Sequence, residues 1–179
     1  ENHDTDRFLR NGQDVPMLKQ ALTLLLTTRR IPQLYYGTEV LMNGTKEVTD
    51  GHVRKDFPGG WPGDKHNCFT AQGRNAAQND MFNWCKTLLN WRKGCKAIHE
   101  GTLTHFIPFK GCYVYARQYE GKTVLIILNG TTKETELPMD RYAEVIGKKT
   151  EGRNIITGKN ITLQGTLSLS PRASLIVEL

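Results

Sequence analysis

Two groups of polar residues in this sequence have the types and spacing to bind a ligand. The first is Asn2, His3 and Asp4 in the segment ENHDTDRF, and the second is Asp50 and Arg54 in the segment DGHVR. A histidine ring can donate to a hydroxyl group, and a carboxylate near a guanidinium can accept from one hydroxyl while the guanidinium donates to the next. The alternative for the first group is a turn, and for the second an ion pair that holds a loop. The residue types therefore indicate recognition of adjacent hydroxyls, with a structural role left open for each group.

The elements expected around these residues follow from the hydrophobic pattern of the first half of the chain. A helix is predicted over 14–30, where Asp14 can cap the N-terminus and leucines recur on one face. A short buried parallel strand is predicted over 33–36, and a second helix over about 76–93. The segment 37–75 is rich in Gly, Pro, Asp and Asn and has no sustained period. It is predicted to be a functional loop at the carboxyl end of the strand.

The second half of the chain has a different pattern. Short runs of β-branched and aromatic residues alternate with turn residues, which predicts an antiparallel β-sandwich over residues 99–179. The runs are CYVYARQY, TVLIILNG, NIITGK, ITLQ, TLSLS and SLIVEL. The change of period predicts a domain boundary between Gly94 and Gly101, and hence domains over 1–98 and 99–179.

The first half contains too few elements to fold as a complete domain. One parallel strand with two helices cannot bury both of its faces, so further βα units are required. Residues 1–98 are therefore predicted to be the end of a (β/α)8 barrel, with NHD as the loop after the seventh strand and LYYG as the eighth strand. The fold class expected is α/β followed by all-β, and the chain is expected to be a piece of a longer protein.

Composition excludes several classes of protein. The 179 residues are 38% hydrophobic and 23% charged, which is ordinary for a globular protein. The net charge is +6, but the 24 Lys and Arg are interleaved with acids, so no nucleic-acid partner is expected. The longest apolar run, ALTLLL, is too short to cross a membrane, and the four cysteines lack the spacing of a zinc site. The compartment remains open, with the periplasm or the extracellular space favoured over the cytoplasm.

The chain resembles a known family along its whole length. The segments that carry the resemblance are ENHDTDRF, RRIPQLYYGTE, DGHVRKDFPGGW, LLNWRK and a β domain ending in SLIVEL. In this order and spacing they look like the C-terminal portion of an α-amylase-superfamily glycoside hydrolase of family 13. The segment DFPGGW and the tail are most similar to the cyclomaltodextrinase and neopullulanase-like branch.

The resemblance implies a role for each polar group. This family cleaves α-glucosidic bonds with retention, using a nucleophilic carboxylate and a carboxylic acid/base about 5 Å apart. Asp4 matches the aspartate that stabilises the transition state, and His3 matches the neighbouring sugar-binding histidine. Asp50 and Arg54 match a pair that binds sugar toward the non-reducing end. The nucleophile and the acid/base belong to motifs upstream of Glu1, so the chain alone is expected to be inactive.

Several alternatives remain from the sequence. The β domain can be a carbohydrate-binding module without catalysis, which would need an exposed aromatic platform drawn from Tyr113, Tyr115, Tyr119 and Tyr142. A transglycosylase of the same superfamily differs only in its acceptor. No cofactor or metal is expected here, although calcium in a longer protein stays open. The expected partner is an α-glucan oligosaccharide, and the oligomeric state is not predicted.

Three further charged residues and two aromatic residues have expected roles around these groups. Asp6, Arg7 and Glu39 match family positions and are predicted to orient the loops at the end of the barrel. Trp61 and Phe57 can stack on a sugar face, or the Pro-Gly-Gly-Trp loop can pack on its own aromatic ring.

Overall fold

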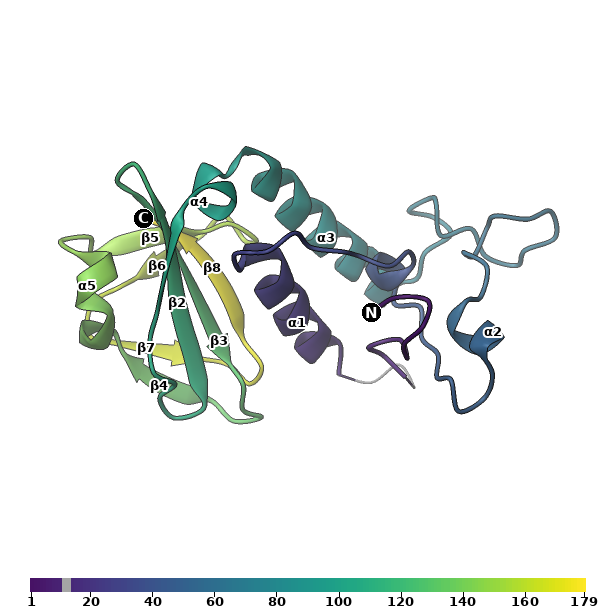
Figure 1. Ribbon diagram of the computed structural model, residues 1–179, viewed down its shortest axis with the longest axis horizontal. Coiled ribbons are helices and arrows are strands. Elements are labelled where there is room, and N and C mark those ends of the chain that lie inside the picture. Colours follow the sequence, from purple (N-terminus) through teal and green to yellow (C-terminus); the bar gives the residue numbers. More distant parts are fainter. Residues whose placement is uncertain (11–13) are drawn as a thin grey trace. The chain divides into compact units, whose positions relative to one another are not determined.

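The computed structural model describes residues 1–10 and 14–179 (Figure 1). Clustering of the contacts gives two compact units, Glu1–Leu18 with Ile31–Lys86, and Lys19–Arg30 with Thr87–Leu179. The unit limits fall inside helices α1 (Val15–Thr27) and α3 (Ala76–Gly94), so each helix contributes residues to both units. The domain limits 1–98 and 99–179 stay a prediction.

Helix α1 begins close to its predicted start. The Asp14 carboxylate accepts a hydrogen bond of 3.0 Å from the Met17 backbone N–H, which caps the helix as expected. On the predicted apolar face, Leu18, Leu22 and Leu26 are buried, whereas Leu25 is only half-buried. Helix α3 also has the predicted extent.

The predicted strand over 33–36 is wrong. Residues 31–35 have no regular secondary structure, and the side chains of Ile31, Leu34 and Tyr36 are exposed. A strand requires a neighbour that pairs with its backbone groups, and within 1–10 and 14–100 the structure has no strand to provide one. The first unit contains instead the short helices η1 (Thr38–Val40) and α2 (Asp50–Val53), between long loops.

The second unit is built on antiparallel strands, as predicted. One sheet has six strands in the order β1-β2-β3-β8-β5-β6, and the other pairs β4 with β7. The bounds are β1 Thr102–His105, β2 Cys112–Tyr119, β3 Lys122–Asn129, β4 Thr135–Pro138, β5 Glu151–Asn154, β6 Asn160–Thr162, β7 Thr166–Leu169 and β8 Ser174–Glu178. Strands β2 and β3 are joined by Glu120 and Gly121, which both have positive φ, as a type I′ hairpin turn requires.

The two sheets share one hydrophobic core. Its members come mainly from one face of the larger sheet and from both strands of the smaller one. Others come from η2 (Met139–Tyr142) and α5 (Ala143–Ile146), which lie between β4 and β5 in the sequence. The buried residues are Cys112, Val114, Ala116, Leu125, Ile127, Leu137, Met139, Tyr142, Val145, Ile146, Leu163, Leu169 and Val177. This shared core is the arrangement of a β-sandwich.

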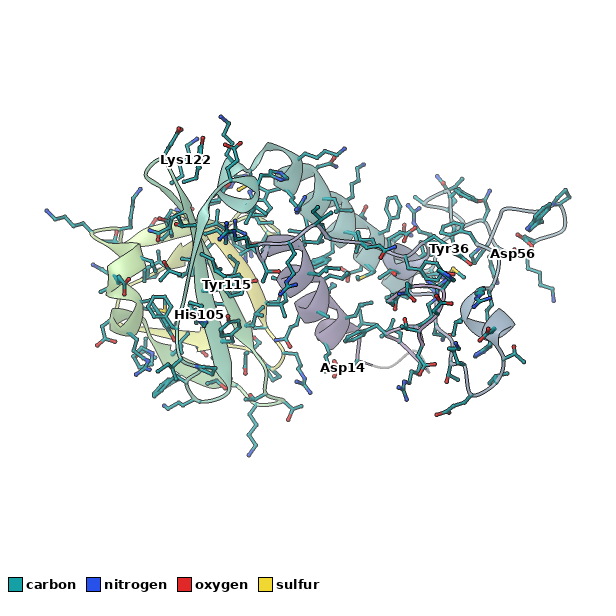
Figure 2. The ribbon with its side chains drawn as sticks, viewed as in Figure 1. Asp14, Tyr36, Asp56, His105, Tyr115 and Lys122 are labelled. Carbon is teal, nitrogen blue, oxygen red and sulfur yellow. The ribbon has the colours of Figure 1, made fainter. Side chains whose placement is uncertain are left out.

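The opposite face of the larger sheet bonds to the part of α1 that belongs to the same unit. Tyr115 on β2 is fully buried, and its hydroxyl lies 2.5 Å from the Thr27 hydroxyl (Figure 2). Gln20 donates to the carbonyl oxygens of Asn129 and Ala173, at 2.6 and 3.0 Å. These bonds connect the helix to the ends of β3 and β8.

Two features of this unit differ from the sequence prediction. The run NIITGK was predicted as a strand, but β5 ends at Asn154 and residues 155–157 form a turn. The Asn154 carboxamide oxygen accepts from the backbone N–H groups of Ile156 and Thr157, which turns the chain. Strands β1, β4 and β5 were not predicted, because each has only four residues and none contains a run of β-branched or aromatic residues.

Within the described residues, no helix has the length and apolar character that a membrane span requires.

Candidate functional site

Arg54 brings the two predicted polar groups together. Its Nη2 atom lies 3.2 Å from Asp4 Oδ1 and 3.2 Å from Asp50 Oδ2, and its Nε donates to the His3 carbonyl oxygen at 2.9 Å. His3, Asp4, Asp50 and Arg54 thus form one cluster in the first unit, although about fifty positions separate its two parts in the sequence. We call these four residues the Arg54 cluster.

The N-terminal part of the cluster is a hydrogen-bonded turn. The Asn2 carboxamide oxygen accepts from the Asp4 backbone N–H at 2.8 Å, and the Asn2 N–H donates to the Thr5 hydroxyl at 3.1 Å. His3 Nε2 lies 3.1 Å from Asp4 Oδ2, so both carboxylate oxygens of Asp4 have neighbours. The side chains of His3 and Asp4 are 63% and 64% exposed, which leaves them open to a ligand.

Helix α2 positions the other part. Thr49 caps it, because its hydroxyl accepts from the His52 backbone N–H at 3.2 Å. Asp50 is the first residue of the helix and Arg54 follows its last, so the two side chains lie one helical turn apart on the same side. This explains why a spacing of four residues forms an ion pair here.

Lys46 is a member of the site that the sequence analysis missed. Its ammonium group lies 3.3 Å from Asp50 Oδ1 and 3.3 Å from the Asp4 carbonyl oxygen. A sequence pattern gives no clear signal for it, because Lys46 lies in the turn before α2 rather than on the helix with Asp50. The site, which consists of the Arg54 cluster and Lys46, therefore has two cations, Arg54 and Lys46, beside its two carboxylates.

Arg7 is buried beneath the loops that carry the cluster, which agrees with its predicted role in orienting them. Its Nε donates to the Val53 carbonyl at 3.0 Å and its Nη1 to the Tyr36 carbonyl at 2.6 Å. The guanidinium carbon lies 4.0 Å from the Tyr35 ring centre, and Nη1 lies 3.5 Å from a Glu1 carboxylate oxygen. Nη2 is buried and has no hydrogen-bond partner among the described residues. Arg7 thus joins the N-terminal turn to the segment at Tyr36 and to the end of α2.

Asp6 fixes a second loop beside the cluster. Its carboxylate accepts from the Lys46 backbone N–H at 2.7 Å and pairs with Arg10 at 3.0 Å. The hydrogen bond from Lys46 is the main cause that lowers the pKa of Asp6, and the Arg10 charge acts in the same direction.

This lowered pKa predicts an acid-sensitive loop. Because the folded state favours the ionised carboxylate, its stabilising effect is present above the ordinary aspartate pKa of 3.8 and is lost as the pH falls through the lower folded value. An NMR titration of the side-chain carboxyl should place the Asp6 midpoint below 3.8. Asp6→Asn should remove the pH dependence of the Lys46 amide signal over this range. A midpoint at or above the ordinary value would contradict the assignment.

The arrangement can bind hydroxyl groups and supply negative charge. Asp4 and Asp50 offer acceptors, and Arg54, Lys46 and His3 offer donors, all at the protein surface. Within residues 1–10 and 14–179, no group of three or more His, Cys, Asp or Glu side chains is placed to hold a metal ion.

Comparisons with known proteins identify relatives along the chain. A family model described as the cyclo-malto-dextrinase C-terminal domain matches residues 103–178. A cyclomaltodextrinase from Thermoanaerobacter pseudethanolicus is 28% identical over 180 residues, covering 99% of this chain and 27% of that enzyme. A cyclomaltodextrin glucanotransferase from Thermoanaerobacterium thermosulfurigenes is 28% identical over 179 residues, covering 96% of this chain and 22% of that enzyme.

A solved structure has the same fold. The α-amylase of Geobacillus thermoleovorans aligns with 99% of this chain and 37% of its own, with a TM-score of 0.72 and 23% identity. The chain thus spans only about a quarter of the length of the curated relatives it matches. Residues 103–178 therefore match the cyclo-malto-dextrinase C-terminal domain, and most of the chain is similar in sequence to cyclomaltodextrinases, cyclomaltodextrin glucanotransferases and an α-amylase.

Proposed function

We propose that this chain is the C-terminal part of a retaining α-glucan hydrolase that cleaves cyclodextrin, pullulan or maltooligosaccharides. In this proposal Asp4 stabilises the transition state, and His3, Asp50 and Arg54 bind sugar hydroxyls. The observation that carries it is the Arg54 bridge between Asp4 and Asp50, at 3.2 Å to each. Asp4 and Asp50 lie in two segments that resemble two separate motifs of the family, and both carboxylates contact the guanidinium of Arg54.

The geometry supports different roles for Asp4 and for the pair of Asp50 and Lys46. An oxocarbenium-like transition state is positive, so an anion held near it stabilises it more than the neutral ground state. Arg54 and His3 each engage one oxygen of Asp4, which orients its carboxylate plane. Asp50 and Lys46 then offer an acceptor and a donor to hydroxyls of a neighbouring sugar unit.

We also propose that residues 1–98 are the last βα units of a (β/α)8 barrel. The exposed Leu34 and Tyr36, at 41% and 40%, support this, because a neighbouring barrel strand would cover them. The buried Nη2 of Arg7 also supports it, since a strand beside Tyr36 would supply an acceptor. The relatives' greater length leaves room for the remaining units.

The inactivity of the chain alone is the first test of this function. We expect the 179-residue chain to release no reducing sugar from cyclodextrin, pullulan or starch, and a longer protein that contains the upstream barrel to do so. Without the nucleophile and the acid/base, the glycosidic bond has neither an attacking group nor a protonated leaving group. Turnover by the isolated chain would overturn this division of the active site.

A transglycosylase is the second candidate, because one relative is named a glucanotransferase. Product analysis of the longer protein distinguishes them, since a hydrolase yields reducing ends in step with bond cleavage and a transglycosylase does not. A carbohydrate-binding module would need an exposed aromatic platform formed by the four tyrosines of the β domain, and this function has less support. Tyr115 and Tyr142 are fully buried, and Tyr113 and Tyr119 are half-buried, so none of them is exposed.

A further inference from the structure

Two large aromatic side chains project from one loop of the first unit. Trp61 and Phe69 lie in the segment 57–70 and are 63% and 64% exposed. The sequence left open whether the Pro-Gly-Gly-Trp loop packs on its own aromatic ring or offers that ring to a sugar, and the 63% exposure of Trp61 favours the second. Phe57, the other candidate for stacking, is half-buried and contacts Phe69 with 4.5 Å between ring centres.

The backbone that carries Trp61 is fixed by hydrogen bonds. The Asp64 carboxylate accepts from the backbone N–H groups of Gly59 and Trp61, at 2.8 and 3.2 Å. The Asp64 N–H donates to the Trp61 carbonyl at 3.2 Å, and the Cys68 N–H donates to the Pro58 carbonyl at 2.9 Å. The loop is therefore closed on itself by backbone hydrogen bonds and by the Asp64 carboxylate.

The base of the loop is attached to helix α3. Arg74 is buried, and it donates to the Cys68 carbonyl at 2.8 Å and to Asn79 Oδ1 at 2.9 Å. Its guanidinium carbon lies 3.8 Å from the centre of the Phe82 ring. The side chain that holds Cys68 is thus itself held by two residues of the helix.

A fixed loop with an exposed indole is suited to a particular class of ligand. Holding the loop in place before binding reduces the entropy lost when a ligand binds. The residues that follow Trp61 include Asp64, Lys65 and His66, all exposed, so the loop that carries the ring also carries polar groups. An apolar face with a polar rim matches a pyranose ring, which has apolar C–H faces and hydroxyls at its edge.

We propose that Trp61 is a stacking platform for a glucosyl unit of an α-glucan, separate from the hydroxyl contacts of the Arg54 cluster. This rests on the proposed function for the class of ligand. Asp64 acts as a positioning residue, because its carboxylate holds the backbone of Trp61.

The test is a titration of the 179-residue chain with maltoheptaose, followed by NMR of the tryptophan indole N–H signals. The Trp61 signal should shift, whereas that of Trp84, which is 8% exposed, should not. Trp61→Ala should weaken binding about tenfold, and Trp61→Tyr should keep it within about threefold, because tyrosine retains an aromatic face. Asp64→Ala should weaken binding through the loop and leave the unfolding midpoint of the second unit unchanged.

Two results would contradict the proposal that Trp61 stacks on a glucosyl unit. One is equal maltoheptaose affinity for Trp61→Ala and the unchanged chain. The other is a Trp61 signal that shifts with protein concentration in the absence of sugar, which would make the indole a contact between copies of the chain. These outcomes are distinct from failure of the proposed function, which is measured by turnover in the longer protein. Loss of turnover in Asp4→Asn leaves the Trp61 test unaffected.

Discussion

Asp4→Asn, made in a longer enzyme that contains this chain, should lower kcat by about 10²–10³-fold and change KM much less. Asparagine has the same shape and can still accept from Arg54, so substrate hydroxyls should bind nearly as before. It lacks the negative charge that an oxocarbenium-like transition state requires. The loss should therefore fall on the chemical step rather than on binding.

The measurement is steady-state kinetics on a maltooligosaccharide, with a matched control. Asp56→Asn removes one exposed carboxylate from the same unit and should leave kcat within about twofold, because Asp56 lies outside the Arg54 cluster. Circular dichroism of both variants establishes that they fold. A kcat for Asp4→Asn equal to that of the control would remove Asp4 from the catalytic step.

Arg117→Met should destabilise the second unit by about 3 kcal/mol. Arg117 is fully buried in β2, and it donates to the carbonyl oxygens of Gly101, Thr27 and Thr102 at 2.8, 3.1 and 3.2 Å. Burial lowers the pKa of its guanidinium, so the cation depends on these acceptors. Methionine fills much of the volume but leaves these three carbonyl oxygens without the guanidinium donor, and the two that are buried belong to Gly101 and to Thr27, the last residue of α1.

Urea unfolding, followed by the fluorescence of the chain, measures this effect. Arg153→Met is the control, because Arg153 is exposed on β5 and its replacement should change the free energy of unfolding by less than about 0.5 kcal/mol. If Arg117→Met unfolds at the same urea concentration as the control, the three hydrogen bonds contribute no net stability. The slope of the transition should be the same for both variants, since neither changes the surface exposed on unfolding.

The sequence predicted the parts of the fold whose signals are local. Strands β2, β3 and β8 are rich in β-branched, aromatic or other apolar residues, and helices α1 and α3 have clear periodicity and, for α1, a capping aspartate. Strand β1 depends on pairing with β2, and its own residues are mostly exposed. In the segment 33–36 the sequence favours a strand, but no strand among the described residues pairs with it, so it does not form one.

The sequence analysis named four residues that the structure brings together, but it did not predict the contacts that join them. His3, Asp4, Asp50 and Arg54 were chosen from the family resemblance, and no spacing in the sequence indicates that one guanidinium joins the two parts. The buried position of Arg7 depends on carbonyl oxygens far away in the chain, which a sequence pattern does not reveal. Arg117 was missed for the same reason, since an arginine in a strand is usually exposed.

The strand order has a consequence for aggregation. The most apolar segment of the chain, VLIIL at 124–128, lies in β3 and is paired on both sides, with β2 and with β8. The outer strands β1 and β6 have only four and three residues, so each offers a short edge to a strand from another molecule. The segment with the greatest tendency to form intermolecular sheets becomes accessible only when the whole second unit unfolds. Loss of stability in this unit, rather than exposure of its edges, should therefore determine when the protein aggregates.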